Sequence, residues 1–321
     1  MKTRHLVDPE LIKFAETFPP LDLKPEMLPA MREMAAGMTV MGDPSLLGVA
    51  RREVKVPGLA GGDEVRCLVY EPMAGGEDRP AFLHIHGGGY MLGSPEGSDD
   101  RNTRVAAALG AVVVSPDYRL APENPFPGPL DDCAATLSWM MDNAASLAID
   151  TSRIAIGGDS AGGGLAAGLV LRTRDEGKFD IAFQHLVYPM LDDRTTADDA
   201  KLDPVLGEYI WTPDSNRLGW ASYLGGHAPA PPAVPARAES LEGLPPTWIG
   251  IGGLDLFLDE NMAYARRLIA AGVATEFAIY PRAYHGFQFE AGAAVTRRFE
   301  RDYVESLARG LGCTLREAVL A

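Results

Sequence analysis

Ser160 is the residue whose surroundings first suggest chemistry. It occupies the pattern Gly158-x-Ser160-x-Gly162, between the apolar run RIAI and small residues that open a predicted helix. On a sharp strand-to-helix turn, only glycine fits two positions either side of the serine, and the hydroxyl stands exposed. The unpaired N–H groups of the following helix would favour negative charge that develops there. Although such patterns also arise by chance as glycine-rich turns, the flanking strand and helix predict an acyl-transfer nucleophile.

A triple-glycine segment is the second chemical feature. The motif HGGGY begins at His86, directly after the apolar run AFLHI. Three consecutive glycines cost conformational entropy, so they are expected where the backbone must approach another group closely. We expect the N–H groups of Gly88, Gly89 and Ala161 to form an oxyanion hole, with His86 supporting the loop. A phosphate-binding loop is the alternative, but no Lys-Ser/Thr pair follows the glycines.

The elements that would position these groups alternate along the chain from about residue 52. Short apolar runs followed by longer helical patterns are typical of an α/β fold with a mostly parallel sheet. We expect eight strands: Arg52 to Val56, Glu64 to Tyr70, Ala81 to Ile85, Ala111 to Ser115, Arg153 to Ile156, Phe183 to Val187, Thr247 to Ile251 and Glu276 to Tyr280. The expected helices flank this sheet near residues 98–109, 128–146, 160–175, 259–272 and 291–311.

Two stretches depart from the alternation and predict a helical cap. Residues 1–50 form its first part, residues 51–321 the catalytic domain, and residues 192–240 a second cap segment inserted in that domain. The second segment ends in the proline-rich run APAPPAVPA.

A row of methionines marks the first cap segment. Met31, Met34, Met38 and Met41 recur every three or four residues behind Pro29, a favourable first-turn proline, so they share one helical face. We interpret this face as ordinary core packing. The alternative is an adaptable thioether surface at the mouth of a pocket.

Composition excludes several classes of function. The 29 basic and 44 acidic side chains give a net charge of −15, which opposes binding to nucleic acid or an anionic membrane. The N-terminal segment is broken by charges and prolines before any apolar run reaches signal-peptide length. Cys67, Cys133 and Cys313 lack CxxC spacing, so we expect a reduced, cytoplasmic protein without metal or cofactor. The sequence leaves open whether two copies form a homodimer.

The motifs together resemble a known family. HGGGY, about 70 residues before GDSAGG, is similar to the hormone-sensitive lipase family of α/β-hydrolases, and specifically to its bacterial esterases. The blocks DYRLAPENPFP and DLFLDE also resemble the family, although the family often has proline where this chain has Leu256. The resemblance covers most of the chain. It implies an α/β-hydrolase fold and a serine carboxylesterase that needs no cofactor.

The base and the acid follow from the order of the elements. A hydrolase of this class carries its base on a loop after the last strand, where His285 alone among the six histidines lies. Its surroundings, Tyr-His-Gly-Phe, are similar to the family's His-Gly-Phe. For the acid we favour Asp255, which follows the strand TWIGIGG and precedes His285 by 30 residues. Asp192 and Asp193, one strand earlier, are the alternatives. Acidic residues at 259 and 260 fit the first turn of the next helix.

The predicted reaction is hydrolysis of short- to medium-chain carboxylic esters, with Ser160, Asp255 and His285 as a triad. A small-molecule ester is the expected partner. We expect Tyr90, Met38, Trp211 and Phe287 to contact the substrate. Amides or lactones are alternative substrates for the same triad, and a non-catalytic ligand-binding protein is a second class, since fold alone does not fix function. A complete triad favours the enzyme.

Overall fold

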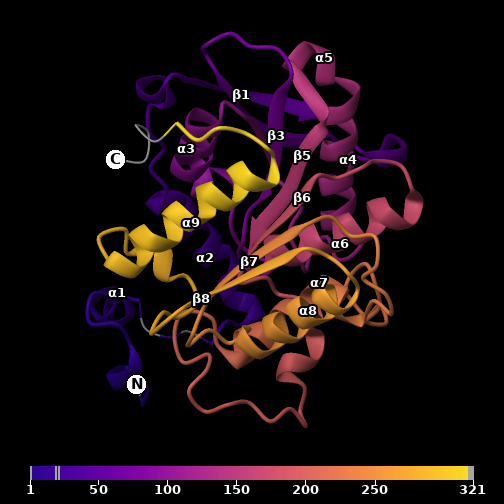
Figure 1. Ribbon diagram of the computed structural model, residues 1–321. Coiled ribbons are helices and arrows are strands. Elements are labelled where there is room, and N and C mark those ends of the chain that lie inside the picture. Colours follow the sequence, from indigo (N-terminus) through magenta and orange to yellow (C-terminus); the bar gives the residue numbers. More distant parts are fainter. Residues whose placement is uncertain (1, 19, 21, 317–321) are drawn as a thin grey trace.

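The computed structural model describes residues 2–18, 20 and 22–316. In these residues eight strands form a single sheet, as the alternating pattern predicts (Figure 1). The strands are β1 (Val49–Val56), β2 (Val65–Pro72), β3 (Arg79–Ile85), β4 (Val112–Pro116), β5 (Ile149–Asp159), β6 (Phe183–Val187), β7 (Thr247–Gly252) and β8 (Thr275–Tyr280). Each contains or overlaps one strand expected from the sequence.

The strand order is β1-β2-β4-β3-β5-β6-β7-β8. β2 pairs antiparallel with both β1 and β4, while every pair from β4 to β8 is parallel. All five residues of β4 and of β6 are buried, because helices cover both faces of a parallel sheet. The parallel strands therefore deliver their carboxyl-terminal loops to one edge, where α/β folds place their ligand sites.

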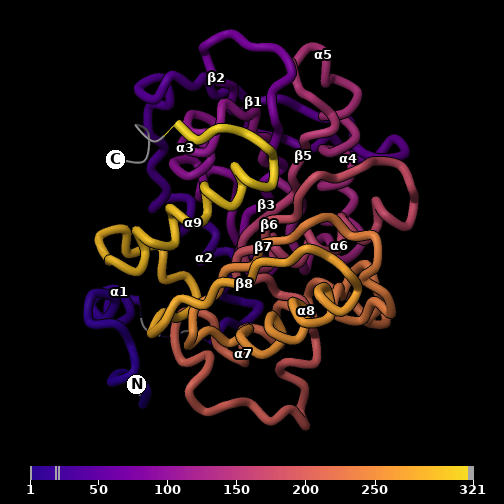
Figure 2. The backbone as a smooth tube through the Cα atoms, viewed as in Figure 1, coloured from indigo at the N-terminus to yellow at the C-terminus, as the bar shows by residue number. Residues whose placement is uncertain are grey.

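Helices cover the two faces of this sheet. α3 (Asp99–Leu109) and α9 (Ala294–Gly310) pack on one face, and α4 (Gly128–Asp142), α6 (Ala161–Glu176) and α8 (Leu258–Ala270) on the other (Figure 2). The helix expected over residues 128–146 is two helices, since α5 (Ala144–Leu147) follows a break at Asn143. There the backbone N–H and the side chain of Asn143 both donate to the Trp139 carbonyl, at 3.0 and 2.9 Å, and its φ of −106° and ψ of 13° depart from helical values.

The two stretches assigned to a cap contact each other. α1 (Ile12–Thr17) and α2 (Leu28–Met38) belong to the first, and α7 (Pro213–Leu224) to the second. The backbone N–H of Leu23 donates to the Ser215 hydroxyl at 3.0 Å, and the Thr212 hydroxyl donates to Asp22 at 2.7 Å. No helix in the described residues has the length and apolar composition needed to cross a membrane.

The interpretation of the methionine face as core packing is wrong. Met34, Met38 and Met41 are 48%, 56% and 44% exposed, and Met31 alone of the four is partly buried. Two features of α2 explain this. The helix ends at Met38, so Met41 lies beyond it, and the residues of α2 that line the cavity are Met31, Arg32, Ala35 and Ala36.

Candidate active site

Ser160 lies on a strained turn between β5 and α6. Its φ of 56° and ψ of −118° are unusual for a residue with a side chain. A Cβ atom on Gly158 would lie 2.4 Å from the Ile85 carbonyl oxygen, and one on Gly162 would lie 2.2 Å from the same atom. Both glycines are therefore required because β3 approaches the turn so closely.

Three side chains from separate loops meet at this turn. His285 Nε2 lies 3.0 Å from Ser160 Oγ, and His285 Nδ1 lies 2.8 Å from Asp255 Oδ2. Asp255 is fully buried, and its other carboxylate oxygen accepts a hydrogen bond of 2.9 Å from the Phe257 backbone N–H. With Nδ1 donating to Asp255, Nε2 is free to accept the serine proton. The structure thus brings together the three residues that the sequence assigned to a triad.

Aromatic rings fix the orientation of the imidazole. The rings of Tyr188 and His285 are 4.4 Å apart between centroids, and Phe257 meets His285 edge-on at 5.3 Å. Burial raises the pKa of Tyr188 well above its ordinary value, so it stays neutral and accepts a hydrogen bond from the Gln288 amide. The sequence did not identify Tyr188, which directly follows β6.

The glycine loop borders the nucleophile. A Cβ atom on Gly87 would lie 3.4 Å from Ser160 Cβ, and Gly88 and Gly89 have φ values of 126° and 61°. In the part of the chain that the structure describes, the N–H groups of Gly88, Gly89 and Ala161 have no protein acceptor. These three donors are available to an oxyanion, and all three are the groups expected from the sequence.

His86 supports this loop from behind. Its Nδ1 lies 2.9 Å from the Gly87 carbonyl oxygen, and its ring stacks on Tyr118 at 4.2 Å. Burial lowers the pKa of His86 to about 4, so near neutral pH the ring is uncharged and its Nδ1–H donates to that carbonyl. A Cβ atom on Gly93 would lie 2.9 Å from the same nitrogen, which shows how tightly the loop closes on the ring.

A buried ion cluster adjoins the nucleophile. Arg101 of α3 donates to Asp159 at 2.7 Å and to Glu300 of α9 at 2.6 Å. Burial opposes ionisation of Asp159, but Arg101 and His84 hold its pKa at about 2. Asp159 is therefore a carboxylate whose position is set by two helices of one face of the sheet.

A cavity of about 1090 Å³ opens onto Ser160 and His285. Residues of α2, the glycine loop, α3 and α9 line it, together with Trp211 and Phe289. A Cβ atom on Gly89 would lie 2.0 Å from the Trp211 ring, so the indole covers the glycine loop directly. Among the described residues, no group of three His, Cys, Asp or Glu side chains is placed to hold a metal ion.

Comparison with known proteins decides the family. A family model described as the alpha/beta hydrolase fold matches residues 82–289. This chain belongs to the α/β-hydrolase family. It is 35% identical over 292 residues to carboxylesterase NlhH of Mycobacterium tuberculosis, covering 88% of each protein.

Solved structures agree with this assignment. A bacterial heroin esterase is 39% identical, with a TM-score of 0.88 over 96% of this chain and 99% of that one. An esterase of the bacterial hormone-sensitive lipase family is 28% identical, with a TM-score of 0.77 over 95% and 99% of the two chains. The resemblance of this α/β-hydrolase to that family is confirmed.

Of the four residues expected to contact substrate, only Trp211 lines the cavity. Tyr90 is fully buried because it stacks on Tyr223 at 4.0 Å and donates to the Met190 carbonyl. Phe287 is also fully buried, against Phe299. Met38, at the exposed end of α2, lies outside the lining. The expectation for Tyr90 and Phe287 is therefore wrong, whereas that for Met38 stays a prediction.

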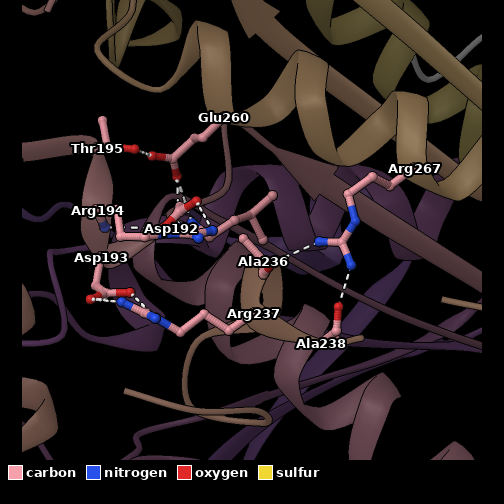
Figure 3. A network of polar contacts seen from close by, with 10 residues as sticks. Asp192, Asp193, Arg194, Thr195, Ala236, Arg237, Ala238, Glu260 and Arg267 are labelled. Carbon is pink, nitrogen blue, oxygen red and sulfur yellow. Dashed lines mark hydrogen bonds and ion pairs between the residues drawn. The ribbon is translucent and has the colours of Figure 1, made fainter. Parts of the chain in front are cut away.

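The alternative acids have other partners (Figure 3). Asp192 pairs with Arg194 at 2.8 Å, and Asp193 pairs with Arg237 at 2.6 Å.

Glu260 does lie in the first turn of α8, but its role exceeds helix stabilisation. It is buried and accepts from the N–H groups of Leu191 and Asp192 at 2.7 and 3.2 Å, which ties α8 to the loop after β6. Burial raises its pKa well above the ordinary value.

Sequence reasoning also missed residues that line the cavity. Arg101 and Glu300 show no local motif, since they meet only when α3 and α9 pack together. Phe289 lies two residues beyond the predicted Phe287 and is 62% exposed. Gly286, just before both phenylalanines, has a positive φ of 77°, and of the two rings Phe289 lines the cavity while Phe287 is buried.

Proposed function

We propose that this protein is a serine carboxylesterase that hydrolyses short- to medium-chain carboxylic esters through Ser160, His285 and Asp255. Membership of the family and identity to named esterases make it a carboxylic ester hydrolase. The observation that carries the proposed mechanism is the position of His285, whose two ring nitrogens lie 3.0 Å from Ser160 Oγ and 2.8 Å from Asp255.

The proposed reaction proceeds in two halves. His285 Nε2 takes the proton of Ser160 as Oγ attacks the acyl carbon, and Asp255 stabilises the resulting imidazolium. The N–H groups of Gly88, Gly89 and Ala161 stabilise the oxyanion. His285 then protonates the leaving alcohol, which leaves an acyl-enzyme. Water, activated by the same imidazole, attacks this ester and releases the acid.

The proposed acyl preference rests on the cavity. Each buried methylene contributes about 0.8 kcal/mol, so affinity rises with chain length until the available wall is covered. The Trp211 indole, placed directly against Gly89, limits the space beside the nucleophile. Longer acyl chains must then leave carbons in water.

A substrate panel with one active-site variant tests this proposal. Purified protein should hydrolyse p-nitrophenyl butyrate faster than a matched anilide or a lactone. Ser160→Ala should lose activity by a factor on the order of 10⁴ to 10⁶ while keeping the wild-type circular dichroism spectrum and melting profile. Wild-type turnover by the folded variant would refute the assignment. Binding of esters without hydrolysis would favour the non-catalytic class.

A further inference from the structure

The cavity wall is positively charged in an acidic protein. Five arginines and three carboxylates line the cavity, whereas the chain as a whole carries a net charge of −15. The arginines are Arg32, Arg101, Arg104, Arg297 and Arg301, and the carboxylates are Asp100, Asp159 and Glu300. They gather where α2, α3 and α9 border the cavity beyond the nucleophile.

Three of these arginines have carboxylate partners. Arg32 pairs with Glu123 at 2.8 Å, and Arg104 pairs with Asp100 at 2.8 Å. Arg101 is shared between Asp159 and Glu300, as described above. Each of the three lining carboxylates therefore has an arginine partner on the same wall, and Arg101 serves two of them.

Arg297 and Arg301 are not neutralised. They lie one helical turn apart on α9, so their side chains share a face. Within residues 2–18, 20 and 22–316, neither makes an ion pair, and Arg301 makes no hydrogen bond. Arg297 donates only to the Gly292 carbonyl. Both are exposed at the cavity, beside the apolar surfaces of Phe289 and Val304.

We propose that the cavity selects esters that carry a carboxylate remote from the scissile bond, and that Arg297 and Arg301 bind this carboxylate. This inference rests on the proposed function. Guanidinium groups match carboxylates in charge and in the geometry of two parallel hydrogen bonds. The apolar stem between ester and carboxylate would lie against Phe289. A protein of strong negative charge repels an anion at long range, so a local positive wall would be needed to admit one.

An unpaired arginine is not by itself a binding site, and the chain offers a matched control. Arg266 of α8 is likewise exposed and, in the described part of the chain, has no ion pair. It does not line the cavity. If free arginines act only through net charge, Arg266→Gln should affect an anionic substrate as much as Arg297→Gln or Arg301→Gln alone.

The test compares monomethyl adipate with dimethyl adipate, with rates for the diester expressed per ester group. Wild-type protein should show the lower KM for the half-ester at low salt. In the Arg297→Gln/Arg301→Gln double variant, KM for the half-ester should rise by about fivefold, with kcat and the diester unchanged, as expected for exposed charge pairs. High salt should raise the wild-type KM for the half-ester alone. In O-acetyl hydroxy acids the carboxylate lies on the alcohol side of the scissile ester. Comparing their KM with that of their methyl esters tests whether the arginines bind a carboxylate on that side.

The outcomes separate this inference from the proposed function. Hydrolysis of dimethyl adipate with no advantage for either anionic series would overturn the inference and leave the esterase intact. A rise in KM for the half-ester in Arg266→Gln equal to that in Arg297→Gln or Arg301→Gln alone would also overturn it. Failure to hydrolyse any of these esters, or p-nitrophenyl butyrate, would overturn the proposed function itself.

Discussion

Arg101 donates a hydrogen bond of 2.7 Å to Asp159, the residue immediately before Ser160. The same guanidinium donates to Glu300, so α3 and α9 are both tied to the strand that carries the nucleophile. The strained backbone of Ser160 persists only if its surroundings hold it. This ion cluster is one of the contacts that do so.

Arg101→Ala should therefore destabilise the protein by about 3 kcal/mol, because it leaves the buried Asp159 carboxylate without a cation. Arg101→Lys should recover little of this lost stability, since an ammonium lacks the planar guanidinium geometry that contacts two carboxylates at once. Urea unfolding measures both effects. Arg104→Ala, which removes an exposed pair on the same helix, is the control and should cost less than about 1 kcal/mol. Equal losses would show that the cluster has no special role.

Asp255→Asn should reduce kcat by roughly 10⁴ without unfolding the protein, because an amide cannot hold the required imidazole tautomer. Asp192→Asn is the matched control, and its turnover should stay near that of the wild type, since Asp192 pairs with Arg194. Steady-state kinetics on p-nitrophenyl butyrate distinguishes the two. A larger loss at Asp192 would move the acid to the loop after β6.

Acyl selectivity should peak at butyrate or hexanoate in a series of p-nitrophenyl esters and fall by palmitate. Each methylene buried against the cavity wall adds about 0.8 kcal/mol of binding free energy, and this gain ends when the wall is covered. The measurement is kcat/KM for each ester below its micellar concentration. Highest efficiency on palmitate, or activation by emulsified triacylglycerol, would instead indicate a lipase.

Stability should fall as the pH decreases from about 6.5. Burial lowers the pKa of His185 from its ordinary value of 6.5 to about 3. Between these values the unfolded chain binds a proton that the folded chain does not, so acid favours unfolding. One such histidine contributes a loss of about 2 kcal/mol in unfolding free energy from pH 7 to pH 5. Between pH 7 and pH 5, the unfolding free energy of His185→Gln should fall by about 2 kcal/mol less than that of the wild type, as measured by urea titration. An unchanged pH dependence would mean that His185 is charged when folded.

The inner strands β3, β4, β6 and β7 were predictable because each is a short, mostly apolar run, as burial on both faces of the sheet requires. The nucleophile turn was predictable for a related reason. Gly158 and Gly162 have no room for a side chain beside the Ile85 carbonyl, so the tight packing at this turn requires a recognisable pair of glycines. The break at Asn143 was not predicted because the backbone angles of a single residue leave no periodic signal.

The cavity wall was much less predictable. Phe289 lines it and Phe287 is buried, and the periodicity of the sequence carries no signal for this difference. Tyr90 follows the glycine loop but has a φ of 64°, which directs it into the core. Arg301 lies on a helix whose orientation depends on its packing against β6 and β7. Such contacts between distant segments have no local motif.

Covalent labelling with a p-nitrophenyl phosphonate, read by mass spectrometry, tests the central claim most directly. The reagent should add one phosphonyl group per chain, release one equivalent of p-nitrophenol, and map to the peptide that contains Ser160. Ser160→Ala, folded as the wild type, should remain unlabelled. A label on another residue, or full activity in protein labelled at Ser160, would contradict the assignment of this serine as the nucleophile.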